Sequence, residues 1–548
     1  LMTSTPALLR SLPAILALRM RLVSVFLLAS FGFGTVLNAQ PLDFQMGLPT
    51  QIKLKGQFTQ VLGEVKETYY VISSEPNAGF ILSTFNKKLE PVDAFKLSFP
   101  KDIKLDYSLK KAWLFGDRII LVSHCFNKAL RQDQFHLWHL SLEGEILKGP
   151  VEAARNNGNG IVLDPLKTPF IGCSADQQVI YVLNVEPSLF GQTLAGIQCK
   201  MWDSELELLT NKTLNINVEN QTVKVLSADF RDQNSGIVTL DLVNIPKPGI
   251  KAIPSFALNQ RLYKISLPQA SMVALPISAE DFPYVHQIKA RWSDDSKSIL
   301  AVSCLSGSFK GGIQSILVQR WNSTDTTPVH RHAFPISATF KKSAELQNKK
   351  FRDTGTPKRP IKEVMDLQNH LVELDRDRFT VFGSIERFNR EVPVGKKADE
   401  VSNDAATYTH YSQGNLILNG TWSQGVQRSI ENPLDQIIQP KGIALPTGIA
   451  GLPHHNHTLV LYNDLPENMV VRNQAFKGKG VNNDNLKDAR SVLLHIDNEG
   501  RFSFYKPFAD PKDQGRIYPS TLFKESNTSF VFLGSDSKSM MRLIKASY

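Results

Sequence analysis

The feature that most constrains the fold is a hairpin pattern that returns along the chain. Residues 491–508, SVLLHIDNEGRFSFYKPF, show it clearly, because Val492, Leu494 and Ile496 share one face of an extended segment. A two-residue period predicts a strand. The same spacing resumes after Asp-Asn-Glu-Gly, where Gly500 can take a positive φ at little steric cost. This segment is therefore predicted to form a β-hairpin with a four-residue loop.

Six other segments follow the same plan, with turns expected near residues 87, 143, 204, 269, 323 and 413, ahead of the one near 499. A further strand-like run precedes each turn, as in TYYVIS, DRIILVSHC, QVIYVLNV, GIVTLDLV, SILAVSCL, RFTVFGSI and TLVLYND. The first five turns are about 55–65 residues apart, which suits one four-stranded propeller blade with long loops. The last two intervals are longer, which predicts inserted loops at about 341–363 and 424–457.

The C-terminal segment 517–548 offers three strands, and PTQIKLKG (49–56) is expected to supply the fourth and close the ring. An open ring would leave a strand edge able to pair with other chains. The predicted fold is therefore all-β, a β-propeller with seven or eight four-stranded blades closed by pairing of the N- and C-terminal strands. A pair of β-sandwiches is the alternative.

The first 39 residues read as a secretory signal peptide. An uncharged run over 22–38 follows Arg19 and Arg21 and ends in Asn38-Ala39-Gln40, with Met20 as a possible true start. A membrane anchor or an amphipathic extension is the alternative. Residues 40–548 then form a single exported domain without stable membrane insertion, because no later apolar run approaches the length of a spanning helix. The expected location is periplasmic, cell-surface or extracellular.

Charge adds little to the prediction. The leader holds three basic and no acidic residues, so the mature chain keeps 59 of 62 Lys and Arg against 52 acids, a net charge of +7. The segment 341–363 is the most basic, but it lacks the interleaved aromatic residues that would support nucleic-acid binding. Its Lys349, Lys350 and Arg352 are candidate binding residues, and a solvated linker is the plain alternative.

The second inserted loop holds three histidines, His454, His455 and His457, which are candidate binding residues. Metal ligation is the sharper hypothesis and a solvated loop the plainer one, because adjacent histidines tend to point apart. VNNDNLKD (481–488) is rich in oxygen ligands for calcium but lacks the spacing of an EF-hand loop. No cofactor is predicted, and calcium is kept as an alternative.

The remaining motifs bear on the fold more than on chemistry. Four cysteines, Cys125, Cys173, Cys199 and Cys304, stand in apolar strand-like contexts, so buried thiols and one or two disulfides are both open. His136 and His139 are three apart in one strand and cannot share an ion. The chain lacks the G-x-S-x-G, HExxH, Walker and dinucleotide-binding patterns.

Two resemblances to known families follow from longer motifs. ARWSDDSKSILAV (290–302) resembles the W-S-x-D-x-K/R turn in propellers of periplasmic translocation proteins and prolyl oligopeptidases. LVLYNDLPENM (459–469), the hairpin 491–508 and RIYPSTLFKESNTSFVFLGSDSKSMMRLIKA (516–546) resemble uncharacterised secreted β-propeller-like proteins of Bacteroidetes-type bacteria. The second resemblance implies a secreted propeller and brings no activity with it.

The sequence thus predicts a secreted binding or scaffold module for a glycan, a peptide or a protein partner. Loops on a rigid propeller frame suit that role, and the two inserted loops are the expected interaction surface. The alternative is a polysaccharide-active hydrolase or lyase with acidic residues in the propeller channel. Whether the protein is an enzyme stays open.

Overall fold

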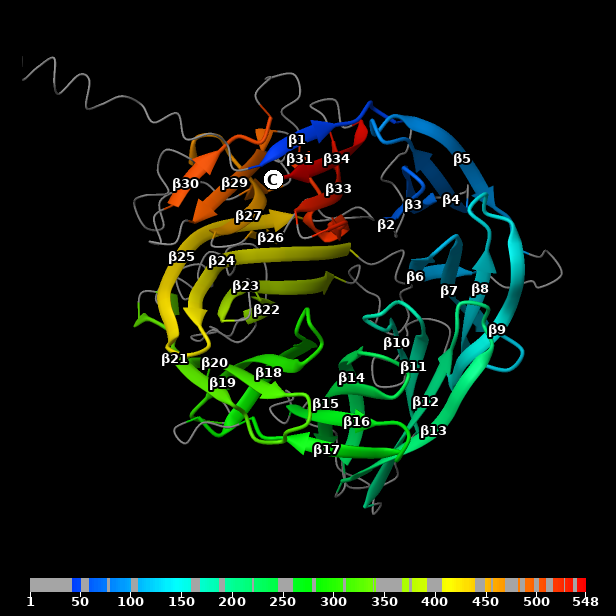
Figure 1. Cartoon of the computed structure of the whole chain (residues 1–548), viewed down its shortest axis with the longest axis horizontal. Helices are drawn as coiled ribbons and strands as arrows, with labels where there is room; N and C mark the ends of the chain where they lie inside the picture. Colours follow the sequence, from blue (N-terminus) through cyan, green and yellow to red (C-terminus); the bar gives the residue numbers. More distant parts are fainter. Residues whose placement is uncertain are drawn as a thin grey trace, which may run out of the picture. The chain divides into compact units, whose positions relative to one another are not determined.

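The chain folds into a β-propeller in the computed structural model. The structure describes residues 42–50, 59–75, 79–99, 107–158, 168–186, 193–218, 221–244, 260–277, 282–308, 312–338, 340–341, 367–373, 377–391, 407–438, 449–454, 457–468, 481–482, 488–496, 502–508, 516–526, 528–535 and 540–548. Strands in this part of the chain form eight sheets within one compact unit, Phe44–Ser547. The sheets are arranged as a ring of eight blades (Figure 1), so the sandwich alternative is wrong.

Blades 1 to 4 each contain four consecutive antiparallel strands. Blade 1 comprises β2 (Thr59–Val65), β3 (Thr68–Glu75), β4 (Gly79–Phe85) and β5 (Pro91–Leu97). Blade 2 comprises β6 (Ser108–Phe115), β7 (Arg118–Asn127), β8 (Gln132–Leu140) and β9 (Ile146–Asn157). Blade 3 comprises β10 (Phe170–Cys173), β11 (Ile180–Val185), β12 (Leu194–Trp202) and β13 (Leu208–Asn217). Blade 4 comprises β14 (Gln221–Phe230), β15 (Ser235–Asn244), β16 (Gln260–Ser266) and β17 (Ser271–Leu275).

The second half of the ring is less regular. Blade 5 comprises β18 (Tyr284–Trp292), β19 (Ser298–Ser306), β20 (Ser315–Asn322) and β21 (His330–Pro335). Blade 6 comprises β22 (Leu367–Glu373), β23 (Arg378–Glu391), β24 (Thr407–Thr421), β25 (Gly425–Ile438) and the short parallel strand β28 (Val481–Asn482). Blade 7 comprises β26 (Ile449–His454), β27 (His457–Asp464), β29 (Arg490–Ile496) and β30 (Phe502–Tyr505). Blade 8 comprises β31 (Arg516–Ile517), β32 (Phe523–Lys524), β33 (Ser529–Ser535), β34 (Met541–Ser547) and β1 (Asp43–Met46), with a 3₁₀ turn at Pro519–Thr521.

The strand pattern of each blade follows from burial. The second strands match the apolar runs of the sequence, and β19 is buried at all nine positions because neighbouring blades cover both of its faces. The outer strand β21 of the same blade alternates instead between half-buried and exposed residues. Turns lie near residues 87, 143, 204, 269 and 323, as predicted, and Ile496 pairs with Phe502 across the predicted seventh hairpin.

Ring closure by the two ends of the propeller is confirmed, but it begins earlier in the chain than predicted. The strand that pairs with β34 is β1. Of the segment 49–56 the structure describes only Pro49 and Thr50, and Thr50 forms an isolated bridge to Met541. The amide of Gly47 donates to the Leu543 carbonyl at 2.9 Å, and that of Thr50 to Met541 at 2.8 Å. Pro49 has no amide hydrogen, so the regular ladder cannot continue through it.

The sixth predicted turn, at residues 413–414, is wrong. The strand β24 runs through it, because β23 offers a partner along the whole of its length and a bulge between Gln413 and Asn415 absorbs the extra residue. The chain turns at 422–424 instead. The inserted loop predicted at 424–457 is consequently also wrong in large part, since β25 and β26 occupy most of it. Pro433 lies at the register break of an outer strand, where a missing amide hydrogen is tolerated.

Apolar clusters fill the seams between blades. Between blades 3 and 4, for example, the rings of Tyr181 and Phe230 lie 4.6 Å apart, and the Tyr181 hydroxyl donates to the Ala228 carbonyl at 2.8 Å. A hydrogen bond also crosses four successive seams, from a side-chain nitrogen of one blade to a carbonyl in the outer hairpin turn of the next. These bonds join Lys148 to Glu205, Lys212 to Leu267, Lys264 to Ser323 and His332 to Trp422.

The motifs that carry the Bacteroidetes resemblance hold the last two blades together. The Asn463 side chain donates to the Ile517 carbonyl at 2.8 Å and accepts from the Ile517 amide at 2.9 Å, so it ties β27 to β31. The neighbouring Asp464 accepts from the Leu465 amide and from the Asn468 side chain. These buried bonds explain what the Asn-Asp motif does, and the role is structural.

Candidate functional site

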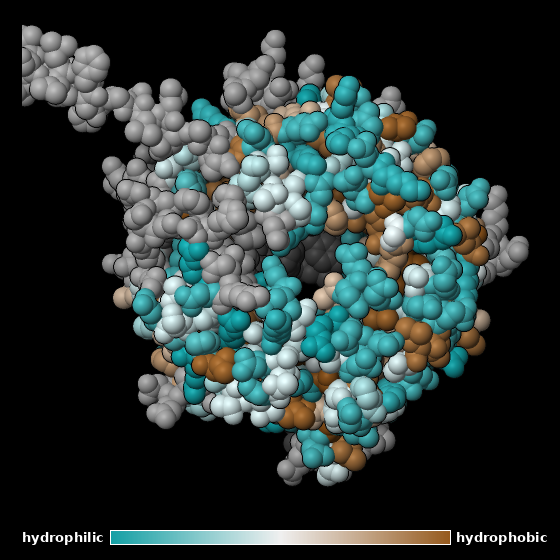
Figure 2. Space-filling model, in the orientation of Figure 1, coloured by the Kyte–Doolittle hydropathy of each residue, from teal (hydrophilic) through white to brown (hydrophobic). Residues whose placement is uncertain are grey.

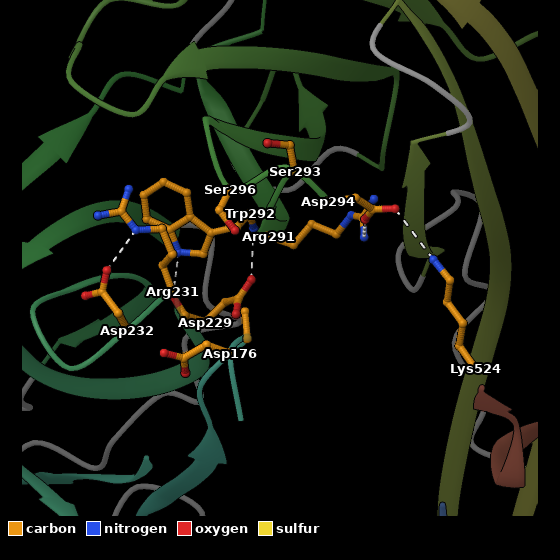
Figure 3. A pocket seen from close by; sticks show the side chains of 11 residues that line it. Asp176, Asp229, Arg231, Asp232, Arg291, Trp292, Ser293, Asp294, Ser296 and Lys524 are labelled. Carbon is orange, nitrogen blue, oxygen red and sulfur yellow. Dashed lines mark hydrogen bonds and ion pairs between the residues drawn. The ribbon is translucent and has the colours of Figure 1, made fainter. Parts of the chain in front are cut away.

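A pocket of about 690 Å³ lies where the first turns of blades 3, 4 and 5 converge. Figure 3 shows the side chains around it, which come from those blades and from blade 8. We call it the central pocket. Its charged residues are Asp176, Asp229, Arg231, Asp232, Arg291, Asp294 and Lys524. Figure 2 shows a hollow near the centre of the ring on the face in view, bordered mostly by hydrophilic residues.

The W-S-x-D-x-K motif forms one wall of the central pocket. The Ser293 hydroxyl donates to Asp295 at 2.7 Å and accepts from the Ser298 amide at 2.9 Å, while Asp295 also accepts from the Lys297 amide. Ser296 completes the turn with a φ of 57°. These local bonds fix the loop between β18 and β19 and present the side chains of this motif to the pocket.

Blade 3 repeats this turn with a different sequence. The Ser174 hydroxyl donates to Asp176 at 2.5 Å and accepts from the Val179 amide, and Asp176 accepts from the Gln178 amide. Gln177 takes a φ of 54°, as Ser296 does in blade 5. The similarity is not obvious from the sequence, because C-S-A-D-Q-Q shares only the serine and the second aspartate with the W-S-D-D-S-K sequence of blade 5. The motif therefore occurs twice along the pocket wall.

Trp292, the only aromatic residue among the described residues of the pocket lining, is buried. It is 4% exposed, its backbone amide donates to the Asp229 carboxylate at 2.9 Å, and its indole nitrogen donates to the Asp229 carbonyl at 3.1 Å. The Arg231 guanidinium stacks over the ring at 5.3 Å from the centroid. The ring face is therefore already covered by a cation, and charged groups dominate the accessible lining.

Two acids of blade 4 have pKa values displaced in opposite directions. Burial raises the pKa of Asp229, although the Trp292 amide and the charge of Arg291 act the other way. Burial would also raise the pKa of Asp232, but bonds from the Asn234 amide and the Arg231 side chain outweigh it and lower the pKa. The pKa values of these two carboxyl groups are thus displaced in opposite directions by their surroundings.

An ion pair joins blade 5 to blade 8 across the central pocket. The Asp294 carboxylate lies 3.2 Å from Nη1 of Arg291 and 3.5 Å from Nζ of Lys524, as the dashed lines in Figure 3 indicate. Lys524 reaches this position from β32. The pair therefore places the positive charge of Lys524, from blade 8, beside the β18–β19 turn of blade 5.

The described residues that line this pocket include none of the binding residues predicted from the sequence. Lys349, Lys350 and Arg352 lie outside the described residues, as does His455. His454 ends β26 and His457 begins β27, and the two are partners in the register of that hairpin. Binding by these residues stays a prediction, as does a calcium site at 481–488, where β28 contains the first two residues.

The structure explains the other histidine and cysteine patterns. His136 lies 3.8 Å from the thiol of Cys125, whereas His139 lies 3.7 Å from Glu205, so the two histidines have different surroundings. None of the four cysteines forms a disulfide. Among the residues that the structure describes, no group of three or more His, Cys, Asp or Glu could hold a metal ion. The described chain also contains no helix long and apolar enough to cross a membrane.

Sequence reasoning missed most of the central pocket. The W-S-x-D-x-K motif indicated one wall of it but was interpreted as a fold signal alone. Asp229, Arg231 and Lys524 stand in no recognisable motif, because each becomes part of the site only when separate blades meet. A search for a second S-x-D turn would have found Asp176.

Comparisons with known proteins assign no function to the chain. No protein-family model and no curated protein sequence matches the chain. The WD40 domain of SCAP from fission yeast aligns with 92% of this chain and 98% of its own, at 10% identity and a TM-score of 0.38. The β-propeller domain of the Trilobed protease from Pyrococcus furiosus aligns with 82% and 94%, at 9% identity and a TM-score of 0.34. With scores this low, the fold assignment rests on the sheet order alone.

Proposed function

We propose that the protein is a binding module that takes a peptide segment of a partner protein into the central pocket. The observation that carries the proposal is the pocket lining, in which cations and carboxylates from four blades surround one buried tryptophan. Glycan sites commonly need an exposed aromatic face for the sugar ring, and Arg231 already covers that of Trp292. Charged side chains on a rigid frame suit a peptide that carries charges of its own.

Peptide selection with a blocked pocket tests the proposal. Ala175 is exposed and lines the pocket in the β10–β11 turn, so Ala175→Trp should obstruct the pocket with a large, uncharged side chain. Ala129 is an exposed alanine in the β7–β8 turn of blade 2, away from the pocket lining, and Ala129→Trp is the matched control. Peptides selected from a random phage library on the wild-type protein should bind Ala175→Trp at least about tenfold more weakly, which is about 1.4 kcal/mol, and Ala129→Trp equally well.

Several outcomes would contradict peptide binding at this site. Selected peptides that bind both tryptophan variants like the wild type would place the binding surface elsewhere. A panel of oligosaccharides that binds the wild type and is blocked by Ala175→Trp would replace the peptide with a glycan.

A hydrolase is the second candidate function. Its support is the opposed pKa displacement of Asp229 and Asp232, which is the pattern of a general acid beside an ionised carboxylate. Polysaccharides and peptides incubated with the wild-type protein should then yield shorter products, and Asp229→Asn and Asp232→Asn should each abolish them. Intact substrates after prolonged incubation would leave the binding function alone.

Export is also a proposal. The expected signal peptide over 1–39 and the resemblance to secreted Bacteroidetes proteins support it. N-terminal sequencing of the protein recovered from a bacterial periplasm should begin at Gln40, and an intact N-terminus would contradict cleavage.

A further inference from the structure

The unused hydrogen-bond donors of the central pocket indicate the charge of its ligand. An arginine has five N–H donors and a lysine has three. Arg291 has a single ion-pair partner in the described chain, Asp294, and its Nε is buried without a hydrogen-bond partner there. Lys524 likewise pairs with Asp294. Arg291 and Lys524 together therefore have more N–H donors than they give to Asp294.

The other carboxylates of the pocket are satisfied by nearby groups. Asp176 accepts from its own turn, and Asp232 accepts from the Asn234 and Ser235 amides. Asp229 accepts from the Trp292 amide. These bonds are made within the protein and do not need a ligand. On the side formed by Arg291 and Lys524 the pocket thus offers spare donors to a ligand, which favours an acceptor group that carries negative charge at this place.

The contact between Asp294 and Lys524 is one that a ligand could replace. Their side chains are 53% and 43% exposed, and Nζ lies 3.5 Å from the carboxylate oxygen. Ion pairs this open to water contribute little to stability. Replacement of the Asp294 carboxylate by a carboxylate of the ligand would therefore cost little free energy, provided that the ligand carboxylate also reaches Arg291.

We propose that the central pocket binds a carboxylate of an acidic peptide between Arg291 and Lys524, and that Asp294 occupies this place in the free protein. The inference rests on the proposed peptide-binding function and specifies the charge of the peptide. The flat fork of a guanidinium suits two-point binding of a carboxylate, and the lysine adds a point charge from the opposite side. Asp294 then acts as a competitor within the chain.

Opposite effects of two substitutions test this inference. The probes are fluorescein-labelled deca-glutamate, deca-lysine and a Gly-Ser decapeptide, followed by fluorescence anisotropy on the full chain at two salt concentrations. Asp294→Asn removes the competitor and should tighten deca-glutamate binding about threefold, whereas Lys524→Met should weaken it about tenfold. Deca-lysine and the neutral peptide should not bind.

Matched controls separate the pocket from the general charge of the protein. Asp93→Asn and Lys128→Met change the net charge by the same amounts at exposed residues of blades 1 and 2. Both should leave the affinity for deca-glutamate unchanged. Equal effects from the control and pocket variants would overturn the inference, because the binding would then follow net charge.

Failure of this inference is distinguishable from failure of the proposed function. If deca-lysine binds and Asp294→Asn weakens it, the pocket prefers cations and the inference is overturned while peptide binding stands. If peptides selected by phage display occupy the pocket but deca-glutamate does not bind, the inference is again overturned. If the selected peptides bind the Ala175→Trp variant as tightly as the wild type, the proposed function is contradicted instead.

Discussion

The seam that closes the ring, between blades 8 and 1, contains a polar network whose removal should measurably weaken the fold. The Tyr69 hydroxyl donates to the Glu525 carboxylate at 2.5 Å, and Nζ of Lys545 donates to the Tyr69 oxygen and lies 2.8 Å from the carboxylate. The Glu525 and Lys545 side chains are only 16% and 24% exposed. We predict that Glu525→Gln destabilises the protein at neutral pH.

The magnitude follows from the pKa of Glu525. Burial alone would raise this pKa, but bonds from Lys545, Ser529 and Tyr69 hold it at about 2, below the ordinary value of 4.5. At about 1.36 kcal/mol per unit, the full difference corresponds to about 3 kcal/mol. Water still reaches the network, so we expect about half of this, ~1.5 kcal/mol.

The sign of the pH dependence follows from the same displacement. A carboxyl group with a lowered pKa in the folded state stabilises the protein above its unfolded pKa, and this contribution is lost as pH falls from about 4.5 toward 2. Glu64 offsets part of the loss. Burial and then Glu525 raise its pKa, so the folded protein takes up a proton there first.

Urea denaturation, followed by tryptophan fluorescence at pH 7 and at pH 2.5, checks this prediction. Glu525→Gln should lose about 1.5 kcal/mol at pH 7 and should approach the wild type at pH 2.5. Glu67→Gln is the matched control, because its ion pair with Lys87 lies at an exposed turn of blade 1. A Glu525→Gln variant as stable as the wild type at pH 7, or equally weakened at both pH values, would refute the reasoning.

Three further predictions concern the packing of the blades. Asn463→Ala should cost about 2–4 kcal/mol in urea denaturation, because both backbone groups of Ile517 lose a buried partner; an unchanged midpoint would contradict the role of the Asn-Asp motif. Trp138→Phe should cost about 1–2 kcal/mol, since the buried Ser123 hydroxyl loses the indole donor at 2.7 Å, and recovery by Ser123→Ala in the same background would confirm the cause. Burial raises the pKa of Cys125 to about 11 and that of Cys199 to about 12, so a thiol reagent at pH 8 should label neither in the folded protein and all four cysteines in denaturant.

Local patterns were sufficient to predict the blades. A second strand such as β19 reads as an apolar run because neighbouring blades bury both of its faces, and hairpin turns depend on a few adjacent residues. Counting these units predicted seven or eight blades and a closed ring. The exported location and the signal peptide stay predictions from the N-terminal sequence.

Partner strands decided what local patterns could not. Gln413 and Gly414 form a turn or a bulge depending on whether β23 extends beside them, and the sequence of β24 does not contain that information. The length of a strand is set jointly by two segments, since each ladder bond needs both partners. The sixth turn was wrong for this reason.

Most of the central pocket could not be predicted from the sequence. Asp176, Asp294 and Lys524 belong to three blades, and each is an ordinary surface residue in its own hairpin. Their proximity exists only because the ring closes, which brings turns from distant blades around one space. The sequence by itself determined the repeating unit, through local periodicity and turn chemistry. The tertiary structure alone decided which charges meet, because electrostatic interactions depend on distances through space and not along the chain.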